Sequence, residues 1–477
     1  MKGSTKRIEN LKDFVTELNL IEKFNSLDNY PINLINQDIE AKLSRGDKNF
    51  LIQFDDALRS TNFEKIEFLF NFDEIQYKTK RIDYFSNETT VNVDLAIGSK
   101  CSLTYDISTF LSQDFKSLGR YKAFYQVHLN EIQSFHSQFE TVSHQRGAFE
   151  YFYDCIRLKV EGKTYDITQF KTQDVGYYVF ECLVEETFEN YLKACFSIKQ
   201  AIGFINKLMV GDEEFIFDDS NNLYYSNFIR QTIKGFYYPI LTNPYSLPDI
   251  EQKIADDFKD RLTRISSENL TNLVDKIHTN PNLSLAILTI LEVMSVRSLL
   301  LMPSTFTVII ELLSKMIYKD QDGKEKPISD KELAGKIVCD LNGVIDNYCG
   351  FLNEQSILKL KRRLNEINKP INNHHLTNNE KLTRPFEILG IKLTLHDIKI
   401  IEHRNDLLHG NISLDNEIQQ TDENINLYMA YVSAKLFTLI SKLILKSIGY
   451  DGYVYNNAKH IENHINILTE EEYFEKI

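Results

Sequence analysis

The stretch Leu395–Gly410, LHDIKIIEHRNDLLHG, decides how the C-terminal half of the chain is interpreted. Its apolar spacing predicts a helix that ends at His409. At about 100° per residue, isoleucines and leucines share one half of this helix, and Lys399, Glu402 and His403 lie on the other. Arg404 falls inside the apolar half. A guanidinium on a buried face is costly unless it is paired or faces a polar cavity, so Arg404 marks a candidate functional position.

Length and composition indicate a chain of two to four domains, at about one domain per 150 residues. Of its 477 residues, 43% are hydrophobic and 12% aromatic, which is enough for packed cores. The sequence predicts neither a membrane-spanning helix nor a signal peptide. Its six cysteines form no CxxC pair and no zinc-like Cys/His spacing, which indicates reduced thiols and a cytoplasmic location. The net charge of −14 argues against broad nonspecific binding to nucleic acid.

Changes in residue pattern along the chain predict an α+β multidomain fold. An antiparallel β-rich region precedes an all-α bundle. The expected elements include helices over 267–278, 329–349, 354–368 and 423–448 and a hairpin of Glu214–Phe217 with Leu223–Ser226, whereas 370–390 is expected to be an irregular connection. The predicted segments are a helical lead-in (1–30), a β-rich sensor or regulatory domain (31–186), a connector with a helix and a β-hairpin (187–247), a helical linker region (248–300), the helical bundle (301–450) and a polar C-terminal tail (451–477).

The β-rich region contains an internal repeat. Seven residues of Thr104–Asp114, starting with Thr-Tyr-Asp-Ile, recur in Thr164–Asp174 at a constant offset of 60 residues. The match predicts a duplicated β-unit and, with two copies, two halves of a sandwich; two turns that are similar by chance are the alternative. We expect Asp106 and Asp166 to organise turns, and a ligand role is the less favoured alternative.

The motif Arg404-Asn405-x-x-x-His409-Gly410 precedes a predicted long apolar helix over 423–448. It resembles the R-x4-H motif of HEPN domains, which are helical bundles of prokaryotic toxins and phage-defence nucleases. The predicted helix around Glu311 resembles the acidic first helix of such bundles. A β-rich region followed by a HEPN bundle is also similar to the anti-phage proteins called ApeA. The resemblance implies a ribonuclease that cleaves host RNA in abortive-infection defence, with tRNA as one candidate substrate and a phage protein, bound by the β-rich domain, as a trigger.

The residues of the motif also suit RNA cleavage on chemical grounds. RNA carries its own nucleophile, the 2′-OH, so a protein must move a proton and stabilise a charged transition state. His409 suits proton transfer because imidazole titrates near neutral pH. The planar fork of Arg404 matches phosphate oxygens, and Asn405, one turn before His409, is expected to orient the imidazole or contact phosphate. This chemistry requires no metal and no cofactor, and it yields a 2′,3′-cyclic phosphate or 3′-phosphate and a 5′-OH.

The spacing of the two principal residues predicts a dimer. Arg404 and His409 are five positions apart and point about 140° from each other on one helix, so one chain does not converge them on a single phosphate. In HEPN nucleases two copies of the motif face each other, which implies a homodimer formed through the bundle. Two supporting residues, Glu311 and Asp397, provide an alternative explanation. Arg404 would then form a structural salt bridge with one of them, and His409 would only cap the helix.

A basic cluster on a predicted helix over 354–368 is a candidate RNA-binding surface. It consists of Lys359, Lys361, Arg362 and Arg363. These side chains are suited to phosphate, although a solvated helix face explains a single cluster equally well.

Two other functions remain open. One is a noncatalytic HEPN protein that binds RNA or scaffolds a complex, with the β-rich domain as its main binding surface. The other is a β-sandwich that binds a glycan or peptide and dimerises through its helices.

Overall fold

A computed structural model describes most of the chain, which forms two compact units, Met1–Phe306 with Ile412–Ile477, and Thr307–Asn411. The described residues are 15–34, 39–54, 69–79, 92–93, 101–132, 135–146, 149–172, 175–211, 213–227, 231–241, 261–262, 264–317, 324–325, 328–366, 371–372, 378–403, 421–465, 467 and 469–477.

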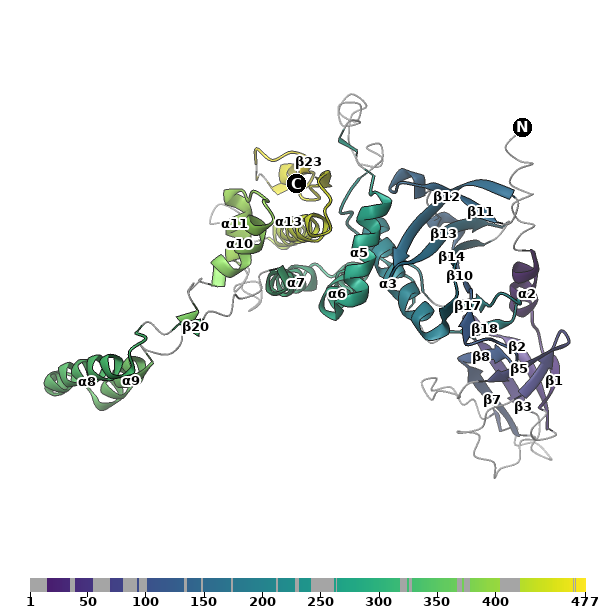
Figure 1. Cartoon of the computed structure of the whole chain (residues 1–477), viewed down its shortest axis with the longest axis horizontal. Helices are drawn as coiled ribbons and strands as arrows, with labels where there is room; N and C mark the ends of the chain where they lie inside the picture. Colours follow the sequence, from purple (N-terminus) through teal and green to yellow (C-terminus); the bar gives the residue numbers. More distant parts are fainter. Residues whose placement is uncertain are drawn as a thin grey trace. The chain divides into compact units, whose positions relative to one another are not determined.

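Two antiparallel sheets dominate the first unit, and helices follow them in the chain, so the predicted α+β multidomain class is confirmed (Figure 1). The smaller sheet contains, in spatial order, β1 (Tyr30–Leu34), β2 (Ile39–Arg45), β3 (Phe50–Phe54), β7 (Cys101–Ile107) and β6 (Asn92–Val93). The larger sheet contains β11 (Val142–Arg146), β12 (Phe149–Val160), β13 (Lys163–Lys171), β14 (Gly176–Cys182), β10 (Lys122–Val127), β17 (Glu214–Phe217), β18 (Leu223–Ser226), β8 (Thr109–Ser112), β5 (Ile75–Thr79) and β4 (Leu69–Phe72).

An aromatic core joins the two sheets. It takes side chains from β1, β2, β3 and β7 of the smaller sheet and from most strands of the larger one. Helix α2 (Val15–Asn25) inserts Phe24, whose ring centroid lies 5.6 Å from that of Phe50 and 5.2 Å from that of Phe110. Phe50 in turn meets Tyr225 of β18 edge-on at 4.7 Å. The described part of the predicted lead-in is therefore a helix of this core.

The other face of the larger sheet is covered by helix α3 (Phe188–Asn206) (Figure 1). Tyr191 of α3 is fully buried and donates a hydrogen bond from its hydroxyl to the carbonyl of Phe180 in β14, at 2.7 Å. The predicted hairpin is β17–β18, and it pairs between β10 and β8. The segment 187–247 is thus not a connector, because it supplies a covering helix and two inner strands of the sheet.

The two copies of the repeat differ in their sheet neighbours. In the second copy β13 pairs directly with β14, whereas β17 and β18 separate β8 from β10 in the first. Burial is similar in the two copies, since Ile107 and Ile167 are both at most 1% exposed. Asp106 lies within β7 and Asp166 within β13, so neither is in a turn, contrary to our prediction. A strand tolerates the buried carboxylate of Asp166 because Arg157 and His144 hydrogen-bond to it.

Helices of the first unit form a second packed region. They are α5 (Ser267–Thr279), α6 (Pro281–Val296), the start of α7 (Leu301–Ile317) and α13 (Asp422–Ser447). Helix α13 packs Phe437 against Phe204 and Tyr237, at ring-centroid distances of 6.3 and 5.4 Å. It is long and apolar enough to cross a membrane, but 83% of its apolar window is buried, which is consistent with a core helix. The predicted bundle 301–450 is divided between the units, because α13 packs in the first.

The predicted C-terminal tail is folded in its described residues. Strands β22 (Tyr453–Tyr455) and β23 (Phe474–Lys476) pair antiparallel. The ammonium of Lys442, which is 1% exposed, lies 2.6 Å from the carboxylate of Glu475, and Lys435 forms an ion pair with Glu471. These acidic residues belong to the segment expected to be a polar tail. They fold back because α13 places two lysines at buried positions that need a counter-charge.

The second unit contains helices α8 (Lys331–Asn347), α9 (Glu354–Asn365), α10 (Asn378–Ile388) and α11 (Leu395–Glu402). The sequence predicted α8 and α9 closely, but the segment 370–390 was expected to be irregular. Helix α10 contradicts that expectation in spite of Pro385. Leu382 and Phe386, one turn apart, are 4% and 0% exposed, so packing of this face offsets the lost backbone hydrogen bond.

Candidate functional site

Three predicted catalytic residues, Arg404, Asn405 and His409, lie outside the described residues. The structure does describe α11, which leads into them. Its N-terminus is a capping box, in which the Thr394 backbone N–H donates to Asp397 Oδ2 at 2.9 Å and the Asp397 N–H donates to Thr394 Oγ1 at 3.0 Å. Such a cap fixes where the helix begins. The helix is described as far as Glu402, with His403 as its C-cap.

The predicted faces of α11 agree with its burial. Ile400 and Ile401 are 5% and 2% exposed, whereas Lys399 and Glu402 are exposed. Arg404 follows Ile400 by four residues and Ile401 by three in the sequence, which is the spacing of one helix face. The described part of the predicted helix therefore has the buried stripe on which the prediction for Arg404 depends.

The two supporting residues have different surroundings. Asp397 is 0% exposed and uses its carboxylate in the capping box. Glu311 lies on α7 in a half-buried position. Asp397 is thus established as a structural residue of α11, and a pairing of either residue with Arg404 falls outside the described residues.

A pocket of about 650 Å³ lies beside α10 and α11. Its polar lining includes Glu380, Glu387, Glu402 and a single lysine, Lys392, with Ile391 among its apolar residues. Three carboxylates against one ammonium disfavour a phosphate in this pocket. The described walls of this pocket therefore provide no anion site.

The predicted basic cluster lies on α9, as expected. Lys361 is engaged, because its ammonium lies 2.5 Å from Asp346 of α8. Lys359, Arg362 and Arg363 are exposed, and no carboxylate of a described residue forms an ion pair with them. Among the described residues, therefore, nothing neutralises three of the four predicted cations, which are suited to a polyanion.

Replacing Arg362 and Arg363 together with alanine should weaken RNA binding in a salt-dependent way. Each phosphate contact with single-stranded RNA contributes about 0.7 to the slope of log K against log salt concentration. We expect the slope to fall by about 1.4, measured by fluorescence anisotropy at several salt concentrations. The control replaces Lys331 and Lys336, two exposed lysines of α8. Equal slopes in both double variants would exclude α9 as the binding surface.

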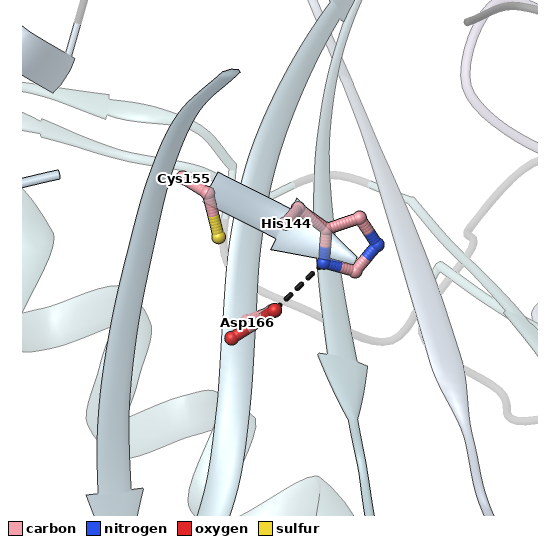
Figure 2. Close-up of side chains that lie close together, drawn as sticks. All are labelled: His144, Cys155 and Asp166. Carbon is pink, nitrogen blue, oxygen red and sulfur yellow. Dashed lines mark hydrogen bonds and ion pairs between the residues drawn. The ribbon is translucent and has the colours of Figure 1, made fainter. Parts of the chain in front are cut away.

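A second cluster, absent from the sequence predictions, lies in the larger sheet. It consists of His144 on β11, Cys155 on β12 and Asp166 on β13, all buried, with one ligand atom of each within 4.8 Å of the others (Figure 2). Asp166 Oδ2 accepts a hydrogen bond from His144 Nδ1 at 2.7 Å. The guanidinium of Arg157 donates to both oxygens of the same carboxylate, each at 2.7 Å. This fork is the bidentate geometry of strong Arg–carboxylate pairs.

The electrostatics of this cluster make Cys155 inert and Asp166 anionic. Burial raises the pKa of the Cys155 thiol, and the Asp166 carboxylate raises it further, so Cys155 is a poor nucleophile. Burial would also raise the pKa of Asp166, but hydrogen bonds from Arg157 and His144 outweigh it and lower that pKa. The cluster as it stands is a charged hydrogen-bond network and not a thiol-based active site.

Acid should remove the contribution of Asp166 to stability. Because its folded pKa is depressed, this contribution is present above the unfolded pKa of about 3.9 and is lost as the pH falls through the folded value. We therefore expect Asp166→Asn to lower the free energy of unfolding near pH 7 and to have a smaller effect near pH 3, by urea titration. Asp219→Asn is the control, since Asp219 contacts Lys116 in an exposed pair. An effect of Asp166→Asn that does not change with pH would contradict this assignment.

Comparison of the chain with protein-family models, curated proteins and solved structures found no match.

Proposed function

We propose that this protein is a metal-independent endoribonuclease of the HEPN type that acts as a homodimer. Its substrate is host RNA, with tRNA as a candidate, and its role is anti-phage defence by abortive infection. The observation that carries the proposal is the buried stripe of α11, whose residues Ile400 and Ile401 precede Arg404 by four and three positions in the sequence. A cation predicted on such an apolar face, with an imidazole five residues later, is better suited to a site than to a solvated surface.

In this proposal each residue of the motif has its own role in RNA cleavage. His409 moves the proton of the 2′-OH or of the leaving 5′-oxygen. Arg404 stabilises the charge that develops on the phosphate oxygens, and Asn405 orients the imidazole or the phosphate. Because the described pocket walls are acidic, the positive charge for phosphate comes from Arg404 and from the α9 cations. The β-rich region of the first unit serves as the sensor for a phage protein, and the chain acts in the cytoplasm.

A mixing experiment tests the shared cleft. Arg404→Ala and His409→Ala chains are purified separately and then mixed under conditions that exchange subunits. A mixed dimer contains one intact Arg404 and one intact His409, so we expect the mixture to recover RNA cleavage that neither variant has alone. Subunit exchange is verified with differently tagged chains. A mixture that forms mixed dimers and remains inactive would contradict the composite site.

A noncatalytic RNA-binding protein is the second candidate. It is favoured by the exposed α9 cations, which can hold phosphate whether or not the motif is catalytic. This candidate predicts RNA binding without cleavage. It also predicts that His409→Ala leaves the affinity for RNA unchanged.

A further inference from the structure

The two ring nitrogens of His144 have unequal surroundings. The residue is 2% exposed, and its Nδ1 lies 2.7 Å from Asp166. Its Nε2 is buried and has no hydrogen-bond partner among the described residues. Glu181 of β14 has its Oε2 3.6 Å from Nε2. A buried polar atom without a partner is costly, so this position needs explanation.

The network fixes the tautomer of His144. Asp166 is held as an anion by the fork of Arg157, so it only accepts hydrogen bonds and Nδ1 must carry the proton. The other ring nitrogen, Nε2, lies 3.6 Å from a second carboxylate, that of Glu181, and makes no hydrogen bond with a described residue. A cation in this gap would satisfy both.

Charged side chains of neighbouring strands form a row beside His144. Antiparallel pairing sets Arg157 opposite Asp166, Asp166 opposite Glu181 and Glu181 opposite Lys122. The ammonium of Lys122 contacts Glu17 of α2 at 2.5 Å. The residues named in this row are three carboxylates, two fixed cations and the His144 imidazole. A proton or a metal ion at His144 Nε2 would place a further positive charge beside Glu181.

We propose that His144 Nε2 and Glu181 Oε2 bind a divalent transition-metal ion of the zinc class. Two metal–ligand bonds of about 2.1 Å that span a 3.6 Å separation enclose an angle of about 120°, which suits a four-coordinate ion. Hydrogen bonding of the other ring N–H to a carboxylate is the usual arrangement of a metal-binding histidine, and Asp166 provides it. The Glu181 side chain is 16% exposed, so water can complete the coordination.

The alternative centre, between His144 Nδ1, Cys155 and Asp166, is less suitable. An ion there would displace the Nδ1 proton and lie next to the Arg157 guanidinium, which already occupies both oxygens of Asp166. The Cys155 thiol would also have to ionise although burial raises its pKa. Figure 2 shows Nε2 pointing away from Cys155 and Asp166, so the proposed site lies on the opposite side of the imidazole ring. Imidazole with carboxylate favours zinc, cobalt or nickel over magnesium and calcium.

Metal binding is tested on the full chain after EDTA treatment and removal of the chelator. Equilibrium dialysis with Zn²⁺ should give one tightly bound ion per chain. His144→Gln and Glu181→Gln should each lower the affinity at least tenfold. Zn²⁺ should also raise the Tm of the wild type more than that of either variant, because only a folded site binds the ion. Circular dichroism of each variant verifies that it is folded.

Two control variants make the result specific. His128→Ala removes an exposed histidine of the same β-rich region, and Cys155→Ser removes the thiol; both should bind Zn²⁺ as the wild type does. Loss of the ion in Cys155→Ser would place it at the alternative centre and overturn the assignment. A wild type that binds no Zn²⁺, or unchanged affinity in both His144→Gln and Glu181→Gln, would also overturn it.

Discussion

His409→Ala is expected to lower the rate of RNA cleavage at least about 100-fold, because general acid–base catalysis contributes about 10²–10⁴. Arg404→Ala should have an effect of similar size, since it removes charge stabilisation of the transition state. Arg404→Lys should rescue little, because an ammonium lacks the planar fork that matches phosphate oxygens. The measurement is the single-turnover rate on a labelled RNA at saturating protein.

The matched control for these variants is His403→Ala. His403 caps the described part of α11 and was predicted to lie on its polar face. Cleavage by His403→Ala should equal that of the wild type. Equal cleavage by wild type, Arg404→Ala and His409→Ala would exclude the motif as the catalytic site, whatever the fold of the second unit.

Glu214→Gln is expected to lower the free energy of unfolding by about 3–5 kcal/mol, the usual cost of breaking a buried ion pair from one side. Glu214 of β17 lies 2.7 Å from the ammonium of Lys199 on α3, and the two side chains are 9% and 2% exposed. Lys199 also lies over the ring of Tyr125, 4.6 Å from its centroid. Chemical denaturation of the purified variant measures the loss.

Two further variants test whether the loss of stability in Glu214→Gln comes from the unpaired buried charge or from altered packing. The double variant Lys199→Met with Glu214→Leu removes both charges and should be more stable than Glu214→Gln alone. Asp73→Asn breaks the pair between Lys23 and Asp73, whose side chains are 53% and 42% exposed, and should cost about 1 kcal/mol or less. A double variant no more stable than Glu214→Gln would show that the unpaired charge is not the cause.

The spacing of apolar residues along the sequence predicted those elements that bury one regular face. The hairpin β17–β18 and helices α5, α9 and α13 lie within a few residues of their predicted ranges. Sheet order could not be predicted in the same way, because β17 and β18 pair with strands far away in the sequence. Helix α10 was not predicted, because Pro385 is typical of a break in a helix. The burial of Phe386 favours the helix, but it depends on tertiary packing, which the local sequence does not reveal.

The cluster at His144 could not be predicted from local sequence either. Its residues come from neighbouring strands, and their sequence separations match no metal-binding or catalytic motif. A usable signal was present in Asp166, which stands between the apolar residues Tyr165 and Ile167 within a strand. A charged residue in an apolar strand needs a partner, by the same argument that singled out Arg404. The sequence therefore indicates that Asp166 needs a partner. Only the register of β12, β13 and β14 identifies Arg157 and Glu181 as the neighbours of Asp166.

The central claim is that the motif cleaves RNA without a metal. Its most direct test is to incubate the wild-type chain with RNA in excess EDTA and to analyse the ends of the products. We expect cleavage to persist and to leave a 2′,3′-cyclic phosphate or 3′-phosphate and a 5′-OH, because the 2′-OH is the nucleophile. Loss of cleavage in EDTA, or products with a 5′-phosphate, would contradict the account.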